Sequence, residues 1–157
     1  APLAVLMLGF ALRWGFIQSL KIRLLAMLHA GFVWLGMALA LNAVSHGLMA
    51  VSSGAVSLGL APLHAMTMGY LGCTMFAMVT RVSSGHGGRK EAADNTAWSL
   101  YWVLQLAVVF RVSAALLEPF SQSSTLTAMA AWCVAMMGWA MRYGVWFGTP
   151  RPDGRDG

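Results

Sequence analysis

The chain has 157 residues, of which 59% are apolar and only 10% charged. Soluble domains carry about 25% charged residues, so this chain lacks the polar side chains needed to cover a water-facing surface. The composition excludes a soluble enzyme, a disordered segment and a nucleic-acid-binding module. The net charge of +5 comes from ten Lys and Arg against five Asp and Glu, and the positions of these ten residues carry more information than their sum.

Uncharged stretches predict the helices. No Asp, Glu, Lys or Arg occurs in residues 24–80 or 119–141. A membrane-spanning helix needs about 20 apolar residues, and residues 45–59, rich in Ser and Gly, suit a loop within the first stretch. Residues 1–12 are apolar but too short to span. The sequence therefore predicts an all-α, polytopic transmembrane bundle with one truncated helix and four full spans, at about 24–44, 61–81, 97–117 and 124–146.

The basic residues predict an orientation. Nine of the ten lie in segments that alternate with the predicted spans: Arg13, Lys21, Arg23, Arg81, Arg89, Lys90, Arg142, Arg151 and Arg155. The opposite loops, 45–60 and 118–123, contain no Lys or Arg. By the positive-inside rule the basic side is cytoplasmic, and so is the tail at residues 148–157. Most of the tryptophans and two tyrosines lie near that side, as in an interfacial aromatic belt: Trp14, Trp98, Tyr101, Trp102, Tyr143 and Trp146.

Four histidines are the first candidates for chemistry, because imidazole commonly ligates haem iron and copper. The predicted topology sorts them into an outer pair, His46 and His64, and an inner pair, His29 and His86. Each pair comes from adjacent antiparallel helices at matching depth, so each could hold one metal ion. The alternative is a polar residue at a helix end, bonded to backbone or to a lipid headgroup. Both interpretations stay open.

Small residues form a stripe along the second predicted span. They recur every four positions, a pattern that lets another helix approach closely: Ala61, Ala65, Gly69, Cys73 and Ala77. Packing is therefore the expected role of Cys73. Cys73 and Cys133 lie in separate apolar stretches, which excludes a disulfide framework and a zinc motif.

Arg111 is the tenth basic residue and lies inside a predicted span. A guanidinium group there is costly unless it reaches the interface or is paired. One interpretation extends it outward, toward Glu118. The other pairs it with a buried anion, such as a haem propionate or an anionic substrate. Asn42 and Gln105, also within spans, are predicted to form hydrogen bonds between helices.

The motifs of this chain resemble those of the NnrS family of bacterial membrane proteins. The segment PLHAMTMGYLGCTMFAMVTR is followed by SSGHGGR, then by FRV at Phe110–Val112 and by RYG and PRPDGR between Arg142 and Arg155. Gly87 stands where the family usually has Thr, and Asp156 where the tail often has Pro. Family members are much longer, so residues 1–157 are expected to be the C-terminal part of one transmembrane domain, packed against preceding helices of the parent chain.

The resemblance implies a multi-pass protein of the bacterial inner membrane that contains haem, with copper as a second candidate cofactor. It also implies a link to denitrification and nitric-oxide stress. His64, Arg81 and His86 are the polar residues of the matched motif, and His29 matches a family position in the segment LHAGFVW. We expect cofactor contacts from these four residues and Arg111, and metal ligation from the four histidines.

Three functions remain open at this point. The first is haem and copper binding in defence against nitric oxide, with Arg81 or Arg111 neutralising haem propionates. The second is transport of a small anion, with Arg111 as the counter-charge. The third is a structural bundle that supports another membrane enzyme. No nucleophile and base come together in the sequence, so whether the protein is an enzyme is left undecided. Membrane lipid and nitric oxide are the expected partners, and nucleic acid is not.

Overall fold

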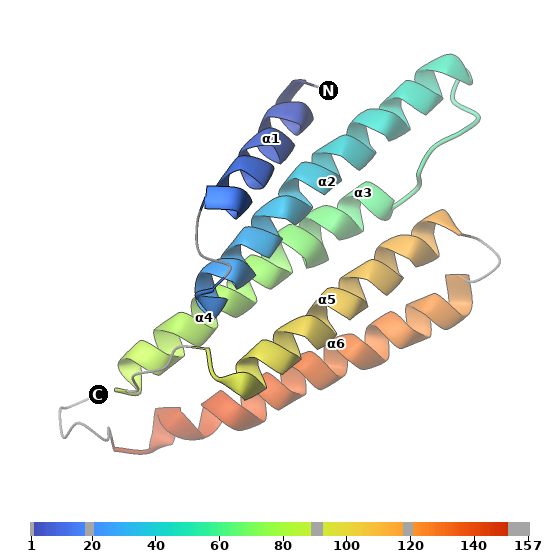
Figure 1. Cartoon of the computed structure of the whole chain (residues 1–157). Helices are drawn as coiled ribbons and strands as arrows, with labels where there is room; N and C mark the ends of the chain where they lie inside the picture. The colour runs from blue at the N-terminus through green and yellow to red at the C-terminus, as the bar shows by residue number, and fades with distance from the viewer. Residues whose placement is uncertain (1, 18–20, 89–92, 118–120, 151–157) are drawn as a thin grey trace.

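A computed structural model of the chain describes residues 2–17, 21–88, 93–117 and 121–150, and all regular structure in these residues is helical. This confirms the all-α class over the described part of the chain. The elements in Figure 1 are α1 (Pro2–Ile17), α2 (Arg23–Val51), α3 (Ala61–His64), a π-helical segment (Ala65–Gly72), α4 (Cys73–His86), α5 (Asn95–Leu116), α6 (Ser121–Gly144) and a 3₁₀ turn (Val145–Gly148).

Helices α3 and α4 form one continuous segment with the π-helical stretch, and α1, α2, this segment, α5 and α6 each run antiparallel to the next (Figure 1). Helix α2 packs on α1 and on the α3–α4 segment, while α5 packs on α6 and on α3. The C-terminal ends of α1, α4 and α6 and the N-terminal ends of α2 and α5 therefore gather at one end of the bundle. Apart from Arg111, the described basic residues lie at or near these helix ends: Arg13, Lys21, Arg23, Arg81 and Arg142. We call this the basic end.

Three helical segments are long and apolar enough to cross a membrane: Arg23–Val51, Asn95–Leu116 and Ser121–Phe147. They coincide with the spans predicted at 24–44, 97–117 and 124–146. The fourth predicted span, at 61–81, lies within a helical segment that a π-helical stretch divides. The count of four spans and the cytoplasmic position of the basic end therefore stay predictions.

The predicted start of the loop at residue 45 is wrong, because α2 continues to Val51. Ser45 is buried, and its hydroxyl accepts a 3.1 Å hydrogen bond from the Leu58 amide, which folds the loop back on the helix. The helix ends only where the backbone turns left-handed, at Ser53 (φ 53°) and Gly54 (φ 88°). Serine and glycine can lie within a helix, and glycine is favoured only where the backbone turns left-handed.

The predicted small-residue stripe is confirmed as a packing face. All five members are buried: Ala61, Ala65, Gly69, Cys73 and Ala77. Side chains four positions apart advance about 40° at each step around an α-helix of 3.6 residues per turn. The wider π-helical turns of Ala65–Gly72 counter this drift, which keeps the stripe on one face. The Trp34 ring packs so closely on this face that a methyl group at Gly69 would lie 2.7 Å from it.

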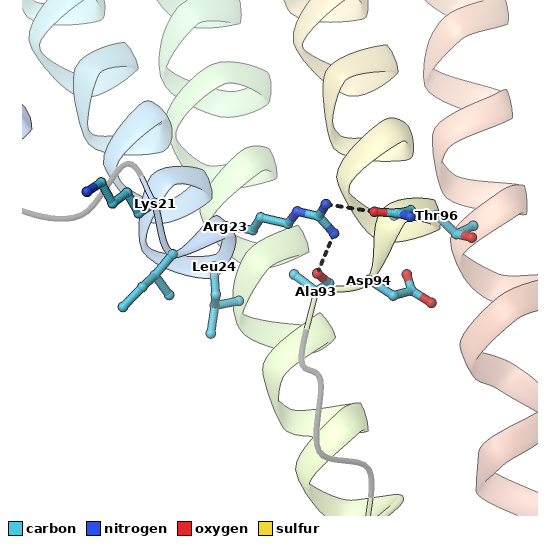
Figure 2. Close-up of a pocket in the computed structure, with 8 residues that line it drawn as sticks. Lys21, Arg23, Leu24, Ala93, Asp94 and Thr96 are labelled. Carbon is cyan, nitrogen blue, oxygen red and sulfur yellow. Dashed lines mark hydrogen bonds between the residues drawn. The ribbon is translucent and has the colours of Figure 1, made fainter.

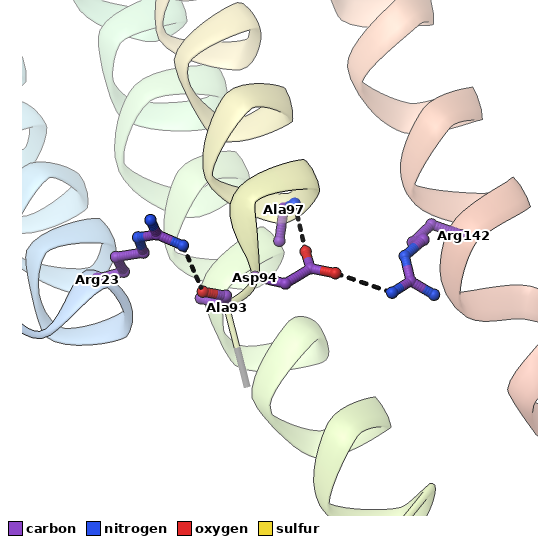
Figure 3. A network of polar contacts seen from close by, with 5 residues as sticks. All are labelled: Arg23, Ala93, Asp94, Ala97 and Arg142. Carbon is purple, nitrogen blue, oxygen red and sulfur yellow. Dashed lines mark hydrogen bonds and ion pairs between the residues drawn. The ribbon is translucent and has the colours of Figure 1, made fainter. Parts of the chain in front are cut away.

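A network of polar contacts joins α2, α5 and α6 at the basic end, and we call it the clasp (Figure 3). Asp94 caps α5 by accepting a 2.8 Å hydrogen bond from the Ala97 amide, and its other oxygen lies 2.8 Å from the Arg142 guanidinium on α6. Arg23 of α2 donates to the Asn95 side chain at 2.7 Å. Burial acts to raise the pKa of the Asp94 carboxyl group. The hydrogen bond from the Ala97 amide and the contact with Arg142 outweigh burial, so this pKa lies below its ordinary value.

Candidate functional site

The most distinctive feature of the fold is an apolar groove of about 630 Å³ between α2 and α5. His29 of α2 lines it, half-buried. Its walls include four aromatic side chains: Trp34, Trp98, Tyr101 and Trp102. We call this cavity the His29 groove. An imidazole among aromatic and aliphatic walls suits a flat, mostly apolar cofactor that is coordinated by one nitrogen atom of the protein.

The sequence of α5 builds one wall of the groove. Trp98, Tyr101, Trp102, Gln105 and Val109 follow the spacing that places side chains on one helix face. The Trp98 and Tyr101 rings are stacked at 6.4 Å, and Trp102 meets Trp98 edge-on at 5.7 Å. Sequence reasoning treated these aromatics as an interfacial belt and missed the groove. Their shared helical face was the available signal, although it does not identify the facing helix.

A chain of polar contacts begins in the wall of the groove and continues to the π-helical segment. The Trp34 indole donates a 2.7 Å hydrogen bond to Oε1 of Gln105, and the Gln105 amide donates to Sγ of Cys73 at 3.0 Å. Cys73 in turn donates to the Met68 carbonyl at 3.5 Å, inside the π-helical segment. The prediction that Gln105 bonds between helices is confirmed. Asn42, by contrast, is exposed, and no hydrogen bond from its side chain occurs within the described residues.

The four histidines occupy different environments. His29 lies in the groove, whereas His46 and His86 are exposed on α2 and α4. His64 is half-buried at the end of α3, and its Nε2 atom is buried with no hydrogen-bond partner. Among the residues that the structure describes, no three His, Cys, Asp or Glu side chains gather as a metal site, and no hydrogen bond links His46 to His64 or His29 to His86. Paired ligation stays a prediction.

The two candidate arginines also differ. Arg81 is exposed on α4, near the basic end. Arg111 is half-buried on α5, on the helix face shared with Leu104 and Val108. Helix α3 packs on α5, and a methyl group at Gly59 would lie 4.0 Å from the Ala115 carbonyl, which places His64 level with the turn of α5 that carries Arg111. Glu118, the partner proposed from the sequence, lies outside the described residues.

A second, polar cavity of about 810 Å³ opens at the basic end (Figure 2). Lys21 and Arg23 line one side, and Asp94, Asn95 and Thr96 line the other. Arg23 bridges the cavity by donating to the Asn95 side chain and to the Ala93 carbonyl. Because the guanidinium is engaged and a carboxylate lies nearby, we interpret this cavity as part of the clasp between helices.

Long apolar helices, a small-residue packing face and basic residues at one end define a helical membrane protein. Comparison with known proteins agrees with this class. The sequence model of the NnrS family, described as NnrS protein, matches residues 1–151. The chain therefore belongs to the NnrS family, as its motifs predicted. Comparisons with curated proteins and with solved structures found no match.

Proposed function

We propose that this chain is part of a haem protein of the bacterial inner membrane that helps the cell withstand nitric oxide and takes part in denitrification. Membership of the NnrS family supports the link to nitric oxide. The observation that carries the haem assignment is the His29 groove, where an imidazole lines an aromatic cavity between two long apolar helices. His29 is the ligand that we assign to the haem iron.

The residues of the groove fit haem in size and chemistry. A volume of about 630 Å³ lies within the usual range of about 300–1,000 Å³ for small-molecule and cofactor sites. Haem is flat and largely apolar, and the groove has indole rings from both helices in its walls. Haem iron takes histidine as an axial ligand, and His29 is the histidine among the lining residues. Bound haem would supply an iron centre able to bind nitric oxide.

The chain's own residues would hold and shield such a group. His29 would ligate the haem iron, and the indole rings of Trp98 and Trp102 would exclude water from one side of the haem. The Gln105 bond to Trp34 fixes the indole that forms part of the opposite wall. Any further ligand to the iron would come from the preceding helices of the parent chain, because His86 is exposed at the end of α4 and does not line the groove.

Copper remains a proposal from the family resemblance. His46 and His86 are its candidate ligands, whereas the positive charge of Arg111 disfavours a metal cation at His64. No cluster of three ligands forms within the described residues, so a copper ion would need further ligands from outside them.

The test is an oxidised-minus-reduced visible spectrum, with iron and copper analysis, of the full-length parent protein purified in detergent. The wild-type protein should show a Soret band and stoichiometric iron. His29→Ala should remove or shift that band and lower the iron content. Asn42→Ala changes an exposed polar residue of the same helix and should leave both unchanged. A His29→Ala protein with an unaltered spectrum would show that the haem, if bound, lies elsewhere.

A further inference from the structure

The positive charge of Arg111 has no partner among the described residues. Arg111 is half-buried within α5, about one and a half turns before the helix ends at Leu116, and α5 is long and apolar enough to span a membrane. Within the described residues, its guanidinium makes no ion pair and no hydrogen bond. A charge at such a position is costly, and arginines in spans nearly always face a partner or a polar cavity. A counter-ion is therefore the missing component.

The side chain of His64 contains a buried polar atom that makes no hydrogen bond. Its Nε2 atom is buried and has no partner. The great majority of buried polar side-chain atoms have one, because an unpaired group loses its bonds to water without replacement. The residue ends α3, which packs on α5, and a methyl group at Gly59 would lie 4.0 Å from the Ala115 carbonyl, so His64 and Arg111 lie at the same level of the two helices. One ligand between the two side chains would satisfy both.

The charge of Arg111 determines the class of that ligand. A metal cation at His64 would be repelled by the guanidinium, whereas an anion would be attracted. A neutral imidazole with its proton on Nε2 is a donor, and the planar guanidinium offers two parallel N–H groups. We propose that Arg111 and His64 form a binding site for a small planar oxyanion, of the nitrate, nitrite or carboxylate class.

This site is separate from the His29 groove. Arg111 shares a face of α5 with Leu104 and Val108, whereas Trp98, Trp102 and Gln105 line the groove from another face. A haem propionate in the groove is therefore not the anion that we assign to Arg111. The proposal does not depend on haem binding, and either can fail alone.

Nitrate is the probe for the test, with the full-length protein in nanodiscs of neutral lipid. Calorimetric titration should detect nitrate binding to the wild-type protein. Arg111→Gln and His64→Phe should each weaken it about ten-fold or more, as expected for lost bonds to a charged ligand. Arg111→Lys keeps the charge without the fork and should weaken it less. Arg13→Gln removes an exposed arginine of α1 and should leave the affinity unchanged.

Other outcomes would overturn the site. If nitrate shifts the Soret band, it binds at the iron. If affinity survives in both Arg111 variants, the anion binds elsewhere. If nitrate does not bind until Glu118→Gln is introduced, that carboxylate is the natural partner of Arg111. If only anionic lipid in the nanodisc raises the unfolding temperature, and does so through Arg111, the ligand is a lipid phosphate. Arg111→Lys and the wild-type titration remain informative should Arg111→Gln fail to fold.

Discussion

Trp34 and Gln105 lie 71 residues apart in the sequence and are joined by a 2.7 Å hydrogen bond between α2 and α5. The same indole ring packs on the Gly69 backbone of the π-helical segment. Gln105 extends the contact to Cys73. Trp34, which lines the His29 groove, thus contacts both α5 and the π-helical segment, and these contacts hold the part of the groove wall that it forms.

Gln105→Leu should lower the free energy of unfolding. The substitution leaves the buried Trp34 N–H without its acceptor, which costs about 1–3 kcal/mol, although hydrogen bonds in membrane proteins average about 0.6 kcal/mol. We expect a loss of about 1–2 kcal/mol in detergent unfolding followed by circular dichroism. Asn42→Leu alters the exposed amide of α2 and should cost much less. Equal losses in the two variants would contradict a role for the Trp34 bond.

Gly69→Ala should disturb the packing of α2 on the π-helical segment. The new methyl group would meet the Trp34 ring at 2.7 Å, so the ring must move and its bond to Gln105 must lengthen. Overpacking of this kind costs about 1–3 kcal/mol. Gly47→Ala is the control at an exposed position of α2. Its new methyl group would meet nothing within 4 Å, so the substitution should be neutral or stabilising. Unfolding temperatures and tryptophan fluorescence of the two variants measure the difference.

Asp94 should make stability depend on pH in the acid range. Its folded-state pKa lies below the ordinary 3.8, so its carboxylate contributes stability above that pH, and the contribution is lost as pH falls through the folded pKa. Asp94→Ala removes the cap of α5 and should cost about 1 kcal/mol at neutral pH. Asp94→Asn retains a capping oxygen and should cost less. Unfolding measured against pH should show the wild-type advantage over Asp94→Ala shrinking below about pH 4. A constant advantage would contradict the assignment.

Filling the His29 groove should prevent haem binding without unfolding the bundle. Ala30 lines the groove, and Ala30→Trp would place an indole in the space proposed for the haem. We expect a large fall in Soret absorbance per protein with unchanged helical content. Ala130→Trp adds the same side chain to an exposed position of α6 and serves as the control. Normal haem content in the Ala30→Trp protein would exclude the groove as the haem site.

Local signals predicted much of the fold. Runs of uncharged residues located α2 and α6, and the apolar stretch that contains Arg111 located α5, because charged side chains are costly in a bilayer. The small-residue spacing predicted the face on which Trp34 packs, and the polar amide of Gln105 predicted a bond between helices. The family followed from motifs in linear order. None of these inferences requires knowing which helix lies next to which.

The tertiary structure alone decided the features that depend on neighbours. Residues 45–51 belong to α2, and the Leu58 amide bonds to the Ser45 hydroxyl from the loop that follows the helix. The aromatic face of α5 became a groove only where α2 supplied His29 opposite it. His64 and Arg111, 47 positions apart in the sequence, lie at the same level of the bundle because α3 packs on α5. Hydropathy determines that side chains are buried, whereas the packing of helices determines what each buried side chain meets.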